Sequence, residues 1–164
     1  MVLCLVVAFL ETAALWWLYF GTAGEHSREA MSDSDDTGRL ARDAYTYLHL
    51  PIVAGIIATA VGAHLLIAEP GDPQHGVGLA MVLGGPALYL LGESLFQWRM
   101  TGRANAKRLT VAGLLILLAP LAGQVSALLL GVIVTALLTA LAVWELQAPP
   151  RLRAELSQFA ATLR

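Results

Sequence analysis

Apolar residues run in long unbroken blocks along this chain rather than alternating with polar ones. Blocks of about 20 residues are what a helix needs to cross a hydrocarbon layer of about 30 Å. Continuous Leu- and Ala-rich blocks favour helices, because strands of membrane barrels alternate apolar and polar positions. The pattern predicts an all-α, polytopic bundle of about five transmembrane helices, at residues 2–20, 47–67, 76–98, 106–119 and 125–144.

The last two predicted spans share one apolar block, residues 109–145, which is too long for a single crossing at about 1.5 Å per residue. Pro120 and Gly123 lie inside this block and are typical of a turn. We therefore predict a short fourth span before this turn and a fifth span after it.

Composition strengthens the membrane interpretation. Hydrophobic residues make up 57% of the 164 residues and charged residues only 13%, too few to cover a soluble domain of this size. The net charge is −2, and no basic patch is interleaved with aromatic residues, so we expect the lipid bilayer as a partner and no nucleic acid.

The basic residues predict the orientation. All ten Lys and Arg fall at residues 28–42, 99–108 and 151–164, which five spans place on one side of the membrane. The positive-inside rule makes that side cytoplasmic. We expect a multi-pass protein of the inner (plasma) membrane with its N-terminus outside, a bundle at residues 1–147 and a cytoplasmic amphipathic tail at 148–164.

The first apolar block could be a signal peptide, but it has no positive n-region and Glu11 interrupts it. The three Arg that follow favour an uncleaved span. Beyond it, Gly21 to Ala44 is polar and acidic, which predicts a solvated loop.

Three ionisable residues, Glu11, His49 and Glu93, share the predicted inner half of the membrane. Glu11 lies about 13 Å above the inner end of its span and Glu93 about 7 Å above that of the third. Tyr89, Glu93 and Gln97 are four residues apart and share one helix face. Ionisable groups at such depths need a partner or a role. Two interpretations stay open: a proton- or ion-linked cluster, or interhelical hydrogen bonds that fix packing.

Small residues form two adjacent rows on the second span. Residues of this size at this spacing let helix backbones approach closely, which predicts a packing seam at Ala54, Gly55, Ala58, Thr59 and Gly62. Pro86 on the third span follows two glycines and predicts a kink.

The sequence offers little for catalysis. The single Cys4 excludes an intrachain disulfide and a cysteine metal cage. His49 and His64 lie about 22 Å apart along one helix, too far to share a metal. We predict no catalytic residue, no metal and no cofactor.

Three sequence strings resemble the bacterial low temperature requirement protein A family. They are ALWWLYF at 14–20, AYTYLHLP at 44–51 and GGPALYLLG at 84–92. The resemblance is to the C-terminal part of family members, which are usually much longer, and so indicates a truncated member or a fragment. It implies a bacterial inner-membrane protein associated with growth in the cold.

Function remains divided between classes. A transporter or channel fits the intramembrane polar residues and the kink at Pro86. A non-catalytic half or subunit of a larger assembly, with a homo-oligomer or a companion membrane subunit as partner, fits the short length and the seam. A membrane enzyme is the weakest alternative.

Overall fold

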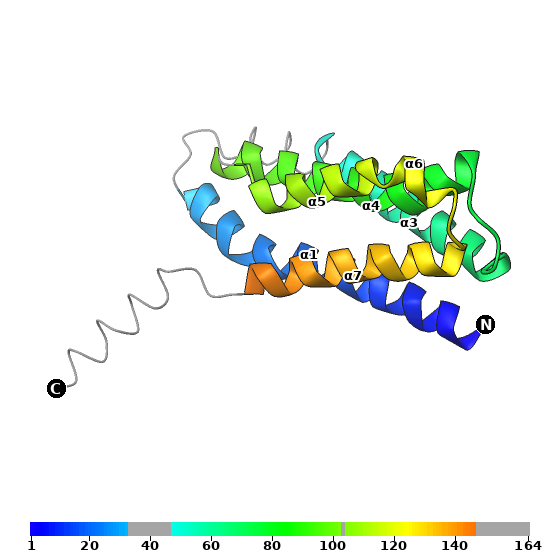
Figure 1. The fold of residues 1–164 in the computed structure, drawn as a ribbon. Helices are drawn as coiled ribbons and strands as arrows, with labels where there is room; N and C mark the ends of the chain where they lie inside the picture. The colour runs from blue at the N-terminus through cyan, green and yellow to red at the C-terminus, as the bar shows by residue number, and fades with distance from the viewer. Residues whose placement is uncertain (33–46, 103, 147–164) are drawn as a thin grey trace.

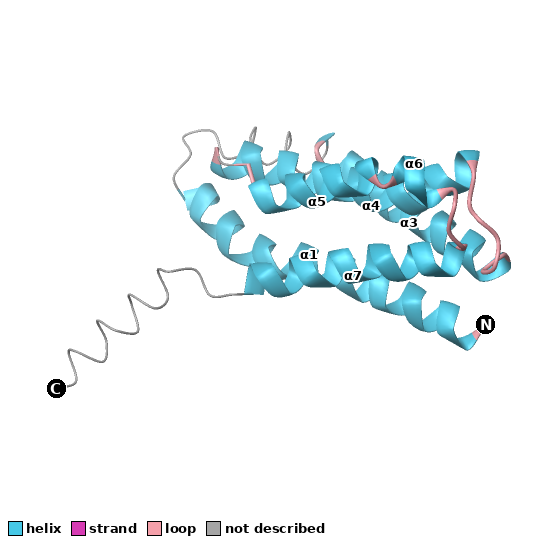
Figure 2. Cartoon of the chain, in the orientation of Figure 1, coloured by secondary structure: helices cyan, strands magenta, loops and turns pink. Residues whose placement is uncertain are grey.

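The computed structural model describes residues 1–32, 47–102 and 104–146. These residues form helices joined by short turns, with no strand among them (Figures 1 and 2). The all-α prediction is confirmed. The helices are α1 (Val2–Ser32), α3 (His49–Ala68), α4 (Gly76–Thr101), α5 (Ala106–Leu117), α6 (Ala119–Ala122) and α7 (Ala127–Leu146).

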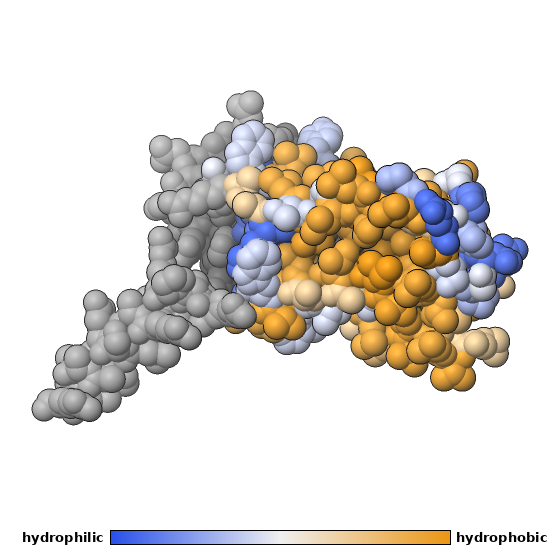
Figure 3. Space-filling view, in the orientation of Figure 1, coloured by the Kyte–Doolittle hydropathy of each residue, from blue (hydrophilic) through white to orange (hydrophobic). Residues whose placement is uncertain are grey.

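Four of these helices, within the described residues, are long and apolar enough to cross a membrane: Val2–Gly21 of α1, α3, Gly76–Met100 of α4, and α7. Their outward faces carry large apolar side chains such as Phe9, Ile57 and Leu129. Figure 3 shows a broad apolar band with polar residues at the two ends of the bundle. This surface suits hydrocarbon rather than water.

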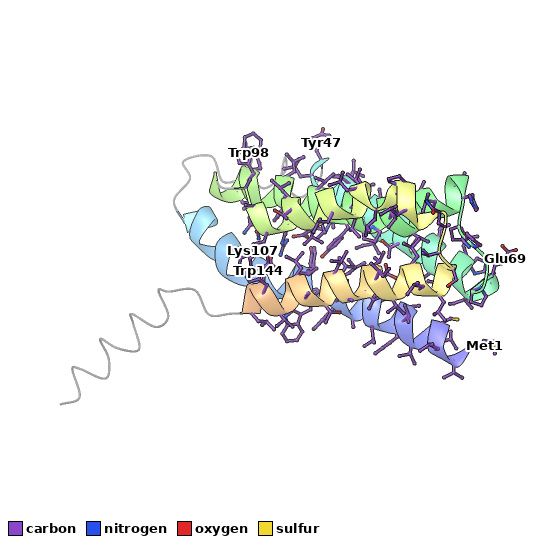
Figure 4. All side chains as sticks on the ribbon, in the orientation of Figure 1. Met1, Tyr47, Glu69, Trp98, Lys107 and Trp144 are labelled. Carbon is purple, nitrogen blue, oxygen red and sulfur yellow. The ribbon has the colours of Figure 1, made fainter. Side chains whose placement is uncertain are left out.

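The short segment α5–α6 also traverses the bundle once. At its start, the Lys107 ammonium donates to the Trp144 carbonyl at 3.2 Å. At its far end, Gly123 lies beside His75. Figure 4 places Lys107, Trp98 and Trp144 at one end of the bundle and Glu69 and Met1 at the other. We call these the Trp144 end and the Glu69 end. The described residues therefore pass along the bundle five times, and four of these passes are helices long enough to cross a membrane, whereas α5 alone is only 12 residues long.

Turn chemistry at both ends fixes these passes. At the Trp144 end, α4 terminates at Gly102 with a φ of 69°, and the Asn105 side chain caps α5 by accepting from the Lys107 amide. At the Glu69 end, the first amides of α7 donate to the loop before α4: Ala127 to the Asp72 carbonyl and Leu128 to the Pro70 carbonyl, both at 3.0 Å. The loop thereby satisfies amides that a helix start leaves unpaired.

Helices α3 and α4 pack with their backbones in close contact. Gly55, Thr59 and Gly62 are buried on α3, and a Cβ added to Gly55 would collide with the backbone of Tyr89. Of the remaining residues of the predicted seam, Ala58 is partly buried and Ala54 is exposed. The α4 side contributes its own glycines, Gly85 and Gly92. Helix α4 is continuous through Pro86, which is fully buried.

Helix α1 is longer than its predicted span. The expectation of a loop from Gly21 is wrong for the described part, because the helix continues to Ser32. The extension contains Ala, Glu, Arg and Met, which are good helix formers, and no proline. The polar residues after Gly21 therefore end the apolar span, but the helix continues through them. The rest of the predicted loop and the predicted tail, residues 148–164, lie outside the described residues.

Candidate functional site

A cavity of about 360 Å³ lies between α1, α3 and α4. Its walls are largely apolar, with Leu15, Ile52 and Ile56 among the lining residues. Its size falls in the ordinary range for small-molecule sites, which are apolar with a few placed polar groups. The polar and aromatic groups of the lining are Glu11, Thr12, Trp16, Tyr19, Phe20, His49, Thr59 and Tyr89.

Glu11 is the acidic residue of this lining. Its side chain is on the inward face of α1, in register with Val7, Ala14 and Leu18, so helix periodicity carries it into the bundle. The residue is 5% exposed, and it forms no hydrogen bond with another described residue. A buried carboxyl without a protein partner is costly and is uncommon in structural roles.

Two aromatic hydroxyls shape the cavity toward the Trp144 end. The Tyr19 hydroxyl lies 3.2 Å from Nε2 of His49, which joins α1 to the start of α3. The Tyr89 hydroxyl donates to the Leu15 carbonyl at 2.8 Å, which joins α4 to α1. The first bond therefore fixes α1 against α3, and the second fixes α1 against α4.

A second polar cluster, centred on Arg108, lies outside the cavity. Its Nη1 donates to Glu93 at 2.8 Å, while Nε and Nη2 donate to the two carboxylate oxygens of Glu145, both at 2.9 Å. Nη2 also donates to the Leu18 carbonyl at 2.9 Å. The guanidinium is 1% exposed and connects α1, α4, α5 and α7.

Neighbouring groups complete this cluster. The Asn105 amide donates to Glu145 at 2.8 Å, and the Lys107 ammonium lies 4.8 Å from the centre of the Trp144 ring. One buried cation thus meets two carboxylates and a carbonyl at the Trp144 end, and the Asn105 amide donates to one of these carboxylates. Such full pairing is what a charge removed from water requires.

The structure divides the polar residues predicted from the sequence. Glu11, His49 and Tyr89 line the cavity together. Glu93 instead pairs with Arg108. Gln97, one turn further along α4, is partly buried and is not among the cavity-lining residues.

The roles of Arg108 and Glu145 do not follow from the predicted spans. Arg108 was counted as a loop charge for the positive-inside rule, but it lies in the first turn of α5 and faces inward. A signal was available, because Arg108 continues the buried stripe of Val111, Ala112 and Leu115 at helical spacing. The pairing with Glu145, 37 residues away, had no local signal.

Within the described residues, no three His, Cys, Asp or Glu side chains gather as a metal site. The arrangement therefore offers an isolated carboxyl in an apolar cavity and, separately, a paired ionic cluster.

The five passes, the apolar belt and the buried polar groups define a polytopic helical membrane protein. Residues 1–143 match the family described as bacterial low temperature requirement A protein (LtrA), and the chain belongs to this family. The predicted resemblance is confirmed.

One curated relative is an uncharacterized protein of Rhizobium meliloti (strain 1021). It is 38% identical over 103 residues, which make up 62% of this chain and 24% of the relative. The match therefore spans about a quarter of the relative's length. No solved structure matches this chain.

Proposed function

We propose that this LtrA protein is a non-enzymatic, proton- or ion-linked transporter whose substrate site is the cavity between α1, α3 and α4. One observation carries the proposal: Glu11 is buried in the cavity lining without a hydrogen-bond partner among the described residues. An unpaired carboxylate is costly at this depth, so the group holds a proton until a cation replaces it.

The exchange is balanced in charge. When the protonated Glu11 meets a cation, the O–H bond breaks, the proton passes to water, and the carboxylate pairs with the cation. The cavity stays neutral in both states, which keeps each state compatible with hydrocarbon. That Glu93 and Gln97 also take part in moving the ion or proton stays a prediction.

The basic residues support a cytoplasmic location for the Trp144 end. Arg99, Lys107 and Arg108 lie there, while the loop at the Glu69 end carries Glu69 and Asp72. By the positive-inside rule, we propose that the protein lies in the inner membrane with the N-terminus outside and the C-terminus in the cytoplasm.

Proton movement in liposomes tests the transporter. Purified protein is reconstituted with a pH-sensitive dye inside, and a gradient of a monovalent cation is imposed across the membrane, because an exchange that is balanced in charge responds to this gradient. We expect proton flux with the unmodified protein and with Glu69→Gln, an exposed acidic control, and loss of flux with Glu11→Gln. Flux that is unchanged in a correctly folded Glu11→Gln protein contradicts the proposal.

A second candidate function is that of a non-catalytic half or subunit of a larger membrane assembly. An open groove of about 660 Å³ runs between α1 and α7, and Thr135 in its lining has a buried hydroxyl without a hydrogen-bond partner among the described residues. Ala136 and Ala140 are small lining residues of the kind that let another helix approach closely. Crosslinking in the membrane distinguishes a homo-oligomer or companion subunit from a monomer.

A further inference from the structure

The cavity between α1, α3 and α4 opens sideways onto the apolar belt. Three of its lining residues lie at this opening and are at the same time on the bundle surface: Trp16 is 57% exposed, Phe20 58% and Ile56 44%. The opening therefore faces hydrocarbon in a membrane. A ligand that partitions into lipid can enter along this route without crossing a polar layer.

The polar groups of the cavity are unevenly placed along its length. Glu11 lies about 13 Å along α1 from Phe20, with the apolar walls of Leu15 and Ile52 between them. One end of the cavity therefore carries an unpaired acid, and the rest offers apolar and aromatic surface. This arrangement matches a molecule with one positive charge and a bulky apolar body.

The aromatic rings favour a cation over a neutral ligand. Trp16, Tyr19, Phe20 and Tyr89 contribute rings to the lining. Ring faces attract cations, and the attraction is largest where water is excluded. The aromatic rings and Glu11 therefore both favour a positively charged ligand.

A bare metal ion fits the cavity poorly. Hard cations need about six oxygen ligands, or retain several waters. The cavity offers one carboxyl, and its other polar groups are already hydrogen-bonded within the bundle: Thr12 and Thr59 donate to the Ala8 and Gly55 carbonyls, Tyr89 donates to Leu15, and Tyr19 pairs with His49. The volume of about 360 Å³ instead suits an organic molecule.

We propose that the cavity binds lipophilic organic cations, in which an ammonium or comparable charge pairs with Glu11 and the apolar body lies against Trp16 and Ile52. The assignment rests on the proposed function, because it names the substrate class of the same site. Entry from the bilayer and release of the Glu11 proton on binding complete the mechanism.

Two probes of the same shape and opposite charge test the assignment. Tetraphenylphosphonium is a permanent cation, and tetraphenylborate is its anionic counterpart. Binding to purified full-length protein is measured by equilibrium dialysis, corrected with empty detergent micelles. We expect the cation to bind at least thirtyfold more tightly than the anion.

Two variants locate the charge and the ring. Glu11→Gln is nearly isosteric and is expected to weaken cation binding by about thirtyfold or more, because one partner of a buried charge pair is lost. Trp16→Leu is expected to weaken it roughly fivefold through loss of ring contact. Glu69→Gln, far from the cavity, is expected to bind as the unmodified protein does. Size-exclusion profiles establish that each variant is folded.

The outcomes separate this inference from the proposed function. Equal binding of both probes, or cation binding that Glu11→Gln leaves unchanged, overturns the assignment even if Glu11-dependent proton flux is present. Selective cation binding without proton release in weakly buffered solution supports the ligand class and overturns proton linkage.

Discussion

Arg108 is the residue on which most of the helices of the bundle converge. Its hydrogen bonds reach the Glu93 and Glu145 carboxylates and the Leu18 carbonyl, so each partner loses a buried donor if the guanidinium changes. Replacing all partners by apolar groups can be harmless in proteins, whereas removing one partner leaves buried charge uncompensated. The effect of a substitution at Arg108 on stability therefore depends on whether the new side chain can reach the same partners, and not only on whether it keeps the positive charge.

Arg108→Lys tests this dependence on geometry. Lysine keeps the charge but has one compact ammonium in place of a planar fork, so it cannot reach both carboxylates and the carbonyl together. Each buried group left unpaired costs about 1–3 kcal/mol. We expect a clearly lower free energy of unfolding, measured by denaturant titration in detergent micelles.

Arg99→Lys is the matched control for this substitution. Arg99 is exposed at the end of α4, and the same change there is expected to alter stability by less than about 0.5 kcal/mol. If the two Lys variants unfold at the same denaturant concentration, the paired network around Arg108 contributes nothing that a simple charge does not.

At the scale of elements, the contact between α3 and α4 depends on glycine on both sides. Gly85 and Gly84 are neighbours on α4, yet they face different surroundings. A Cβ at Gly85 would lie 2.8 Å from the Thr59 hydroxyl and 2.9 Å from the Ala58 carbonyl carbon, while one at Gly84 would meet nothing within 4 Å. Backbone contact of this kind cannot be relieved by a change of rotamer.

A pair of alanine substitutions measures the contact. Gly85→Ala is expected to destabilise the protein by about 1–3 kcal/mol, because the two helices must move apart. Gly84→Ala adds the same methyl group to open space and is expected to leave stability unchanged, or to raise it by up to about 1 kcal/mol through helix propensity. Thermal unfolding of both proteins in one detergent gives the comparison, and equal midpoints would contradict the close contact.

How far the sequence predicts these features depends on whether the signal is local. The bounds of α3, α4 and α7 follow from apolar blocks, because hydrocarbon thickness sets helix length. The end of α1 does not, since helix propensity continues through Ser32 after apolarity stops. On α4, Gly78, Gly85 and Gly92 lie seven residues apart on the face that meets α3, but only the small residues of α3 were used to predict the seam.

For the site, the sequence located the residues but not their grouping. Depth along the helices placed Glu11, His49 and Glu93 in one layer. Depth gives no rotation about the bundle axis, and the structure also separates the two residues along α1. Arg108, the partner of Glu93, donates to the Leu18 carbonyl, and Leu18 lies about 10 Å along the helix from Glu11. The partner of Glu93 was hidden because positive-inside counting treats every arginine alike, whether it faces solvent or the core.

At the scale of the whole molecule, the two ends of the bundle differ in charge and composition. The Trp144 end has the described basic side chains Arg99 and Lys107 and the large aromatic rings of Trp98 and Trp144 (Figure 4). Tryptophan at such a position is typical of a membrane interface. The Glu69 end is a tight set of turns in which residues 70–73 bind the start of α7. This asymmetry is consistent with one fixed orientation.

Cysteine labelling on intact cells tests the orientation and the five passes. In a Cys4→Ala background, single cysteines replace Asp72, Ala104 or Gln124, which are all exposed turn residues. A membrane-impermeant maleimide is expected to label the first and third variants from outside, and the second only after permeabilisation. Asp72 and Ala104 flank α4, so their difference reports that crossing and its direction.

The Gln124 variant decides the role of α5–α6. At about 1.5 Å per residue, residues 106–122 span about 25 Å, slightly less than a hydrocarbon layer of about 30 Å. A short crossing is tolerated if the bilayer thins locally, at a modest cost per ångström. External labelling at Gln124 therefore establishes a true crossing. Labelling only after permeabilisation would place Gln124 on the same side as Ala104, so that α5–α6 would be re-entrant. The end of α7 would then lie outside rather than in the cytoplasm.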